Sequence, residues 1–157
     1  MIDNLPRPDF PSLCSLLSDN EVAYLVIGGW AAIAHGIPRS TLDVGLFIRP
    51  DKGNSGRLIA TLSRVGFGIS RELSPEEILS KKVFLFSDQI RIDVFAEPWG
   101  LDGFESCWSR RLETTFESVT IPFLGLEDLL KSKNTDRDQD QADAEALKRI
   151  VEKRKRD

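Results

Sequence analysis

An apolar run of β-forming residues, 22–27, ends at Gly28 and Gly29, and an Ala-rich segment, 30–35, follows at once. The apolar run predicts a buried strand, and the Ala-rich segment predicts a helix that ends at Gly36. Two glycines at such a junction let a ligand approach the backbone closely, and the first amides of a helix attract phosphate. A plain tight turn needs the same two glycines, so the junction alone does not identify a binding site.

Two further predicted strands each carry an aspartate among apolar residues. Residues 42–48 alternate in polarity and place Asp43 on one face, and residues 89–95 place Asp93 on the face opposite their apolar side chains. A carboxylate inside an apolar strand is costly unless it is paired or bound to a metal. The two aspartates are therefore the candidate functional residues of the predicted sheet.

Two interpretations of these carboxylates stay open. Asp43 could form an ion pair, with Arg39 or Arg91 as its partner. Alternatively, carboxylates on neighbouring strands of one sheet could hold Mg²⁺ together with a triphosphate, and the ion would neutralise phosphate charge and orient an in-line displacement.

The rest of the chain alternates between helical and β patterns. Helices are predicted at 10–17, 56–65, after a capping box at Ser74 and Glu77, at 126–133 and at about 138–153, and strands at 82–86, 112–116 and 119–123. Strands 82–86 and 89–95 should form an antiparallel hairpin. This order predicts an α+β fold, a small mixed β-sheet flanked by helices. We expect one domain over 1–157, with a core at about 22–124 and closing helices at about 125–154.

Composition excludes several classes of protein. The chain has 157 residues, 41% of them hydrophobic and 29% charged, which is ordinary for a globular protein. Its apolar runs fall short of the ~20 residues that span a bilayer, and its first residues lack an apolar leader segment. Cys14 and Cys107 are too few for a disulfide framework and are expected to be inert core thiols, and the one histidine, His35, excludes multi-histidine metal sites. We expect a cytoplasmic protein without membrane contact, and the net charge of -4 disfavours broad nucleic-acid affinity.

The stretch LVIGGWAAIAHGIPRSTLDVGLFI resembles the signature of the DNA polymerase beta-type nucleotidyltransferase superfamily. That signature is a strand, Gly-Gly or Gly-Ser, a helix, Arg-x-Thr-x-Asp-φ-Asp with φ apolar, and a third aspartate on a later strand. The chain is similar to the minimal nucleotidyltransferases, which include AbiEii-type abortive-infection toxins. The positions that match are Gly28, Gly29, Arg39, Thr41, Asp43 and Asp93, and in the group's closing pattern Lys133, Arg137, Asp140 and Asp143.

The resemblance implies the nucleotidyltransferase fold and the transfer of a nucleoside monophosphate from an NTP to an acceptor hydroxyl. Asp43 and Asp93 would be the catalytic carboxylates and would hold Mg²⁺. The residues implied to contact the nucleotide are Gly28, Gly29, Arg39, Thr41 and Lys133. The acceptor, whether tRNA, protein or a small molecule, is left open.

One position departs from the signature. The family has a second carboxylate two residues after the first, and this chain has Gly45 there, on the same predicted strand face as Asp43. Glycine supplies no metal ligand, so we expect weaker metal binding and slower chemistry. The alternative is a catalytically inactive nucleotide-binding or regulatory module, or a toxin–antitoxin component that binds an antitoxin protein.

Other residues carry two interpretations each. Lys133 is either a phosphate contact or a solvated lysine at a helix end, and Arg137 either contacts phosphate or joins an ion network with nearby aspartates. Trp30 is expected in the core, with stacking on a nucleobase as the alternative. His35 is expected as a helix cap or a core residue, and Trp99 is given no role beyond packing.

Overall fold

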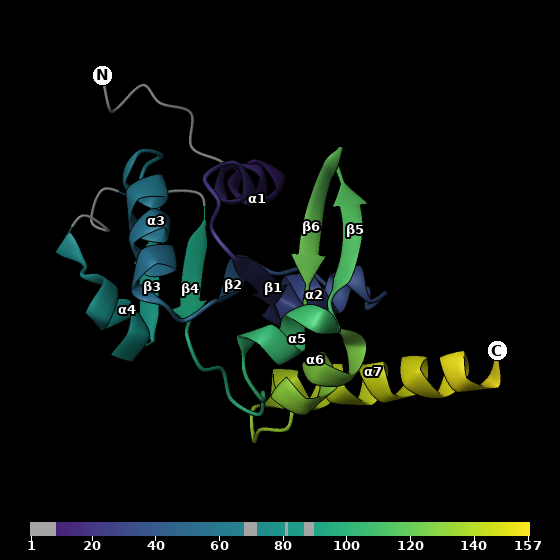
Figure 1. Ribbon diagram of the computed structural model, residues 1–157. Helices are drawn as coiled ribbons and strands as arrows, with labels where there is room; N and C mark the ends of the chain where they lie inside the picture. The colour runs from purple at the N-terminus through teal and green to yellow at the C-terminus, as the bar shows by residue number, and fades with distance from the viewer. Residues whose placement is uncertain (1–8, 68–71, 81, 87–89) are drawn as a thin grey trace.

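A six-stranded mixed sheet forms the centre of the structure, a computed structural model that describes residues 9–67, 72–80, 82–86 and 90–157. The strand order is β3-β4-β2-β1-β6-β5 (Figure 1). The strands are β1 (Tyr24–Ile27), β2 (Asp43–Ile48), β3 (Val83–Phe86), β4 (Arg91–Phe95), β5 (Leu112–Phe116) and β6 (Val119–Phe123). The pairs β2–β4 and β1–β6 are parallel, and the other pairs are antiparallel. The predicted α+β fold with a mixed sheet is confirmed.

Helices cover this sheet. They are α1 (Phe10–Asp19), α2 (Gly28–Ala34), α3 (Lys52–Ser63), α4 (Pro75–Ser80), α5 (Phe104–Ser109), α6 (Leu126–Ser132) and α7 (Asp138–Arg156). In Figure 1, α1 lies above the centre of the sheet and α6 and α7 lie below it. Helix α2 contacts β1, β2 and α6, while α1 contacts β6 and α3. None of the described helices combines the length and apolar character that a membrane crossing requires.

The apolar faces of the central strands form the core. All four residues of β1 are buried, so this strand is covered on both sides. In β4 the alternation predicted from the sequence is present, and in β2 it holds until Phe47, which is buried as well. The fully buried side chains on the core face are Val44, Leu46, Ile48, Ile92 and Val94. The opposite faces of β2 and β4 carry Asp43 and Asp93, which lie beside a cavity described below.

Several element boundaries differ from the predictions, and three of them are at the start of an element near the cavity or the core. Helix α2 begins at Gly28 rather than at residue 30, so the glycine pair belongs to its first turn. Helix α3 begins at Lys52 rather than at residue 56, because the Asp51 carboxylate accepts a hydrogen bond from the Asn54 amide at 2.7 Å and caps the helix. Strand β2 begins at Asp43, and the preceding Leu42 is exposed instead of buried.

The predicted capping box and hairpin are present. The Glu77 amide donates to Ser74 Oγ at 3.2 Å, and the Ser74 amide donates to Glu77 Oε1 at 3.1 Å. Strands β3 and β4 pair antiparallel as predicted. The predicted hairpin turn at residues 87–88, and residues 1–8 at the start of the chain, lie outside the described residues. Helix α5 was not predicted from the sequence, because it is short and lacks a clear apolar period.

Candidate active site

Asp43 and Asp93 lie on the same face of two adjacent parallel strands. The pairing register sets Asp43 opposite Arg91 and Gly45 opposite Asp93, so the two aspartates are diagonal neighbours. Their side chains are 49% and 15% exposed, respectively. Both line a cavity of about 300 Å³, hereafter the cavity. The structure thus brings the two predicted carboxylates to one solvent-accessible place.

The glycine pair lies on another wall of this cavity. Gly28 has a φ of +71°, a conformation that favours glycine. A Cβ on Gly29 would lie 2.8 Å from Thr41 Oγ1, so only glycine allows Thr41 to approach this closely. Thr41 Oγ1 in turn donates to the Asp43 carbonyl oxygen at 3.4 Å. The three residues therefore form one continuous wall beside Asp43.

Arg91, and not Arg39, is the arginine that faces the two aspartates. Arg91 Nε donates to Asp93 Oδ1 at 2.7 Å, and Arg91 Nη1 lies 4.0 Å from Asp43 Oδ2. The hydrogen bond to Asp93 raises the pKa of the Arg91 guanidinium, which stays charged. Asp43 therefore forms the ion pair that the first interpretation predicted, with Arg91 as its partner at 4.0 Å.

Arg39 instead links the loop before β2 to helix α7. Its Nη1 donates to Asp143 Oδ2 at 2.6 Å, although 104 residues separate the two in sequence. Lys133 Nζ lies 3.0 Å from the same Asp143 oxygen and 3.5 Å from Asp140 Oδ1. The result is a cluster of two cations and two carboxylates, hereafter the α7 ion cluster, formed by Arg39, Lys133, Asp140 and Asp143.

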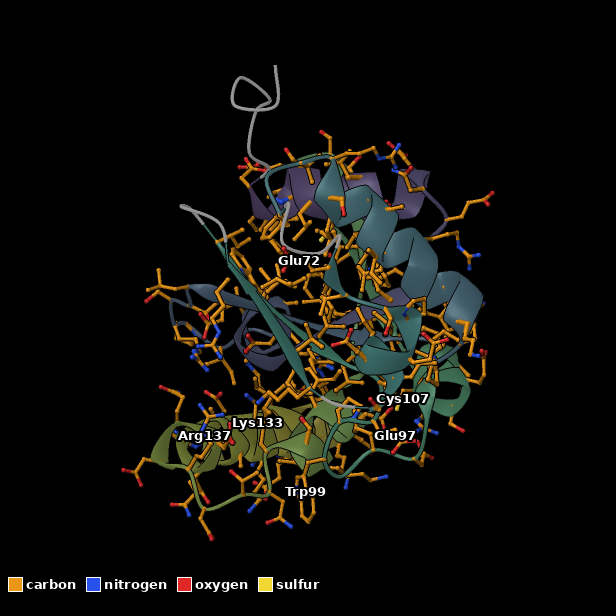
Figure 2. The ribbon with its side chains drawn as sticks, turned by 90° about the vertical axis from the view of Figure 1, so that its left-hand side faces the viewer. Glu72, Glu97, Trp99, Cys107, Lys133 and Arg137 are labelled. Carbon is orange, nitrogen blue, oxygen red and sulfur yellow. The ribbon has the colours of Figure 1, made fainter. Side chains whose placement is uncertain are left out.

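Lys133 is 6% exposed, so the interpretation as a solvated lysine at a helix end is wrong. It lines the cavity together with Arg39, Arg137 and Asp140. Arg137 is exposed, and its Nη1 lies 4.0 Å from Asp140 Oδ2, at the limit of an ion pair. Figure 2 shows Lys133 and Arg137 near the connection between α6 and α7, with Trp99 below them.

Gly45 also faces the cavity, and its surroundings are closed to a larger residue. A Cβ at this position would lie 2.9 Å from Ile27 Cγ1 and 3.3 Å from the Ile27 carbonyl oxygen. Ile27 therefore packs against Gly45, on the strand face where the nucleotidyltransferase signature has its second carboxylate. A side chain at position 45 would therefore require Ile27 to move.

The donor set at the cavity suits one hard cation rather than two. Two carboxylates that face the same space, supplemented by waters and phosphate oxygens, satisfy the preference of Mg²⁺ for oxygen ligands. A second ion would need the carboxylate that Gly45 does not supply.

Elsewhere, the ligand atoms of Asp102, Cys107 and Asp128 lie within 4.8 Å of one another. Arg110 pairs with both of these aspartates, at 2.7 and 2.8 Å, so its charge already compensates them.

Trp99 is a cavity residue to which sequence reasoning gave no function. It is 70% exposed, lines the cavity, and donates its indole N–H to the Asn134 carbonyl oxygen at 3.1 Å. The flanking Pro98 and Gly100 signal a turn, but nothing in the sequence relates that turn to Asp93. Trp30, in contrast, stacks on Phe10 with 4.1 Å between ring centroids, which confirms its predicted packing role.

The two cysteines lie in the core, as predicted. Both are fully buried, and burial raises the pKa of Cys14 to about 12 and that of Cys107 to about 11. At neutral pH both are therefore neutral thiols, and neither provides a nucleophile.

His35 is a buried helix cap, as predicted, and not a residue of the cavity. Its Nε2–H donates to the Leu124 carbonyl oxygen at 2.8 Å, while the buried Nδ1 has no hydrogen-bond partner among the described residues. Protonation would place a second N–H at this unpartnered position. Burial lowers the pKa of the imidazole below its usual 6.5.

The low pKa of His35 makes stability depend on pH. Below about 6.5 the unfolded chain binds a proton that the folded chain does not, so the free energy of unfolding should fall as the pH drops below 6.5. His35→Gln retains a donor for Leu124 and should flatten this dependence. Urea unfolding at pH 7.5, 6.5 and 5.5 measures it. Because the chain has one histidine, an equal decline in both proteins would contradict the assignment.

Comparison with known proteins gives a clear result for the fold. No family model and no curated protein matches the sequence. The lincosamide antibiotic adenylyltransferase LnuA, solved with lincomycin bound, superposes with a TM-score of 0.60 at 19% identity, over 87% of this chain and 92% of that one. An antigenic nucleotidyltransferase-like protein from Paracoccidioides brasiliensis gives 0.59 at 15% identity, over 90% and 72%. The chain therefore has the nucleotidyltransferase fold, and the AbiEii-like subgroup stays a prediction.

Proposed function

We propose that this chain is a nucleotidyltransferase that binds an NTP in the cavity and transfers a nucleoside monophosphate to an acceptor hydroxyl. The observation that carries the proposal is the placement of Asp43 and Asp93 on the same face of two adjacent strands, beside Gly28 and Gly29. When bound by these carboxylates, Mg²⁺ would neutralise phosphate charge and help to orient the displacement.

Different residues at the cavity have different roles in the proposed binding. Gly28 and Gly29 leave room for phosphate to approach the backbone, and the exposed Arg137 supplies positive charge at the cavity. Arg39 and Lys133 act as positioning residues, because their charges are held by Asp143 of α7. Arg91 holds the Asp93 carboxylate in place by its hydrogen bond.

Gly45 makes the proposed transfer slow. A carboxylate at this position would help to hold a second cation, or would accept the proton of the acceptor hydroxyl. Glycine can do neither. The same feature favours a second candidate function, a nucleotide-binding module without transfer activity, acting alone or with an antitoxin protein. The packing of Ile27 on Gly45 supports this candidate, because the Ile27 side chain lies where the side chain of a carboxylate at position 45 would begin.

Two measurements test the proposal. Melting temperatures with each NTP, with and without Mg²⁺, should rise most when both are present, because ligands that bind only the folded state stabilise it. The Asp93→Asn variant should lose the Mg²⁺-dependent part of this rise. No rise with millimolar NTP would exclude the nucleotide site.

Transfer is then measured with radiolabelled NTP and candidate acceptors. The acceptors are bulk tRNA, a protein extract and a lincosamide, the last because LnuA is a lincosamide adenylyltransferase of the same fold. Label transferred by the wild type but not by Asp93→Asn supports the enzyme. Binding without transfer to any acceptor class supports the nucleotide-binding module.

A further inference from the structure

A rigid turn presents Trp99 at the cavity. Gly100 has a φ of +79°, and a Cβ there would lie 2.8 Å from the Lys131 carbonyl oxygen. Only glycine therefore allows the turn to lie this close to the end of α6. The indole N–H of Trp99 is bonded to the Asn134 carbonyl oxygen, which follows α6. The turn is thus fixed to the α6–α7 connection at two points.

The exposure of this indole is not explained by packing. Trp30 stacks on Phe10, and Trp108 stacks on Phe104 with 5.8 Å between centroids. Trp99, in contrast, forms no ring contact among the described residues and is 70% exposed. An indole has a large apolar face and one polar N–H, which suits a residue at the wall of a cavity for contact with a ligand.

The position of Trp99 relates it to the carboxylates. Trp99 lines the same cavity as Asp43 and Asp93, and Phe95 and Pro98, which lie between Asp93 and Trp99 in the sequence, line it as well. The lining of the cavity therefore combines charged side chains with an exposed aromatic ring. A nucleotide likewise combines charged phosphates with a flat base.

We propose that Trp99 stacks on the base of the bound nucleotide, an inference that rests on the proposed function of the cavity. Every nucleobase has a π-face, so an indole binds all of them and discriminates little among them. The chain should therefore accept several NTPs, with preference for the larger purines. The hydrogen bond to Asn134 fixes the ring before the nucleotide arrives, which lowers the entropy cost of binding.

The test compares a ligand that has a base with one that does not. ATP and inorganic tripolyphosphate are titrated by calorimetry into the wild type, Trp99→Ala and Trp99→Phe, with Trp108→Phe as the matched control. Loss of one stacked base should weaken ATP binding about tenfold in Trp99→Ala. Tripolyphosphate binding should not change. Trp99→Phe should retain most of the ATP affinity, and Trp108→Phe should resemble the wild type.

Fluorescence supplies an independent readout. ATP should quench indole emission in the wild type and in Trp108→Phe, but not in Trp99→Phe, which retains only Trp30 and Trp108. Equal weakening of ATP and tripolyphosphate by Trp99→Ala, or unchanged affinity for both, would overturn the stacking role while the nucleotide site stands. A wild type that binds neither ligand would overturn the proposed function as well.

Discussion

Replacement of Lys133 by methionine is expected to lower the free energy of unfolding by about 3–5 kcal/mol, the usual cost of removing one partner from a buried ion pair. Lys133 Nζ lies within 3.5 Å of carboxylates from both Asp140 and Asp143, and all three side chains are buried. Methionine fills a similar volume without the charge. The variant therefore leaves the α7 ion cluster with two buried carboxylates and one cation, Arg39.

Urea unfolding of Lys133→Met measures this loss, and Lys131→Met is its control. Lys131 lies in the last turn of α6, two residues before Lys133, but is exposed, so its replacement should change the free energy of unfolding by no more than about 0.5 kcal/mol. Lys133→Met combined with Asp140→Asn removes the carboxylate that is left without a cation of the cluster, and should recover part of the loss. Equal effects of the two lysine replacements would show that the cluster does not stabilise the fold.

A carboxylate restored at position 45 is expected to have the largest effect on metal binding. Gly45→Asp alone should cost about 1–3 kcal/mol of stability, because its Cβ would press on Ile27 Cγ1. Ile27→Ala removes that atom, at a cost of its own of about 2–5 kcal/mol. The combined variant should lose less free energy of unfolding than the two single variants together, and the difference should be about 1 kcal/mol or more.

The combined variant should also bind Mn²⁺, used as a probe for Mg²⁺, about tenfold more tightly than the wild type, because it has a third carboxylate. Calorimetry measures this affinity, and Ile27→Ala alone is the matched control because it creates the space without the ligand. Transfer of labelled nucleotide should rise in parallel. Unchanged metal affinity and unchanged transfer in the combined variant would contradict Asp43 and Asp93 as metal ligands.

Local patterns were sufficient to predict the strands that carry the candidate site. Alternation along β2 and β4 predicted that Asp43 and Asp93 face away from the core, because each strand has a continuous apolar face on its other side. The glycine pair after β1 predicted the junction with α2. These are short-range properties, since each depends on residues only a few positions apart.

The contacts that complete the site depend on the tertiary structure. The sequence offers no reason to pair Arg39 with Asp143, because several other aspartates are equally plausible partners of this arginine. The packing of Ile27 on Gly45 follows from the register of β1 and β2, which a single strand does not specify. Trp99 reaches the cavity only because its turn lies against α6.

The bond between Arg39 and Asp143 has a consequence for biosynthesis. The ribosome releases the strands with Asp43 and Asp93 well before α7, which begins at Asp138. Until α7 emerges and docks, Arg39 lacks its carboxylate partner and the cavity lacks the lining that Gln139 and Asp140 provide. A polypeptide that stops before α7 would thus lack part of the cavity lining, so the cavity is complete only after α7 has been synthesised and has docked.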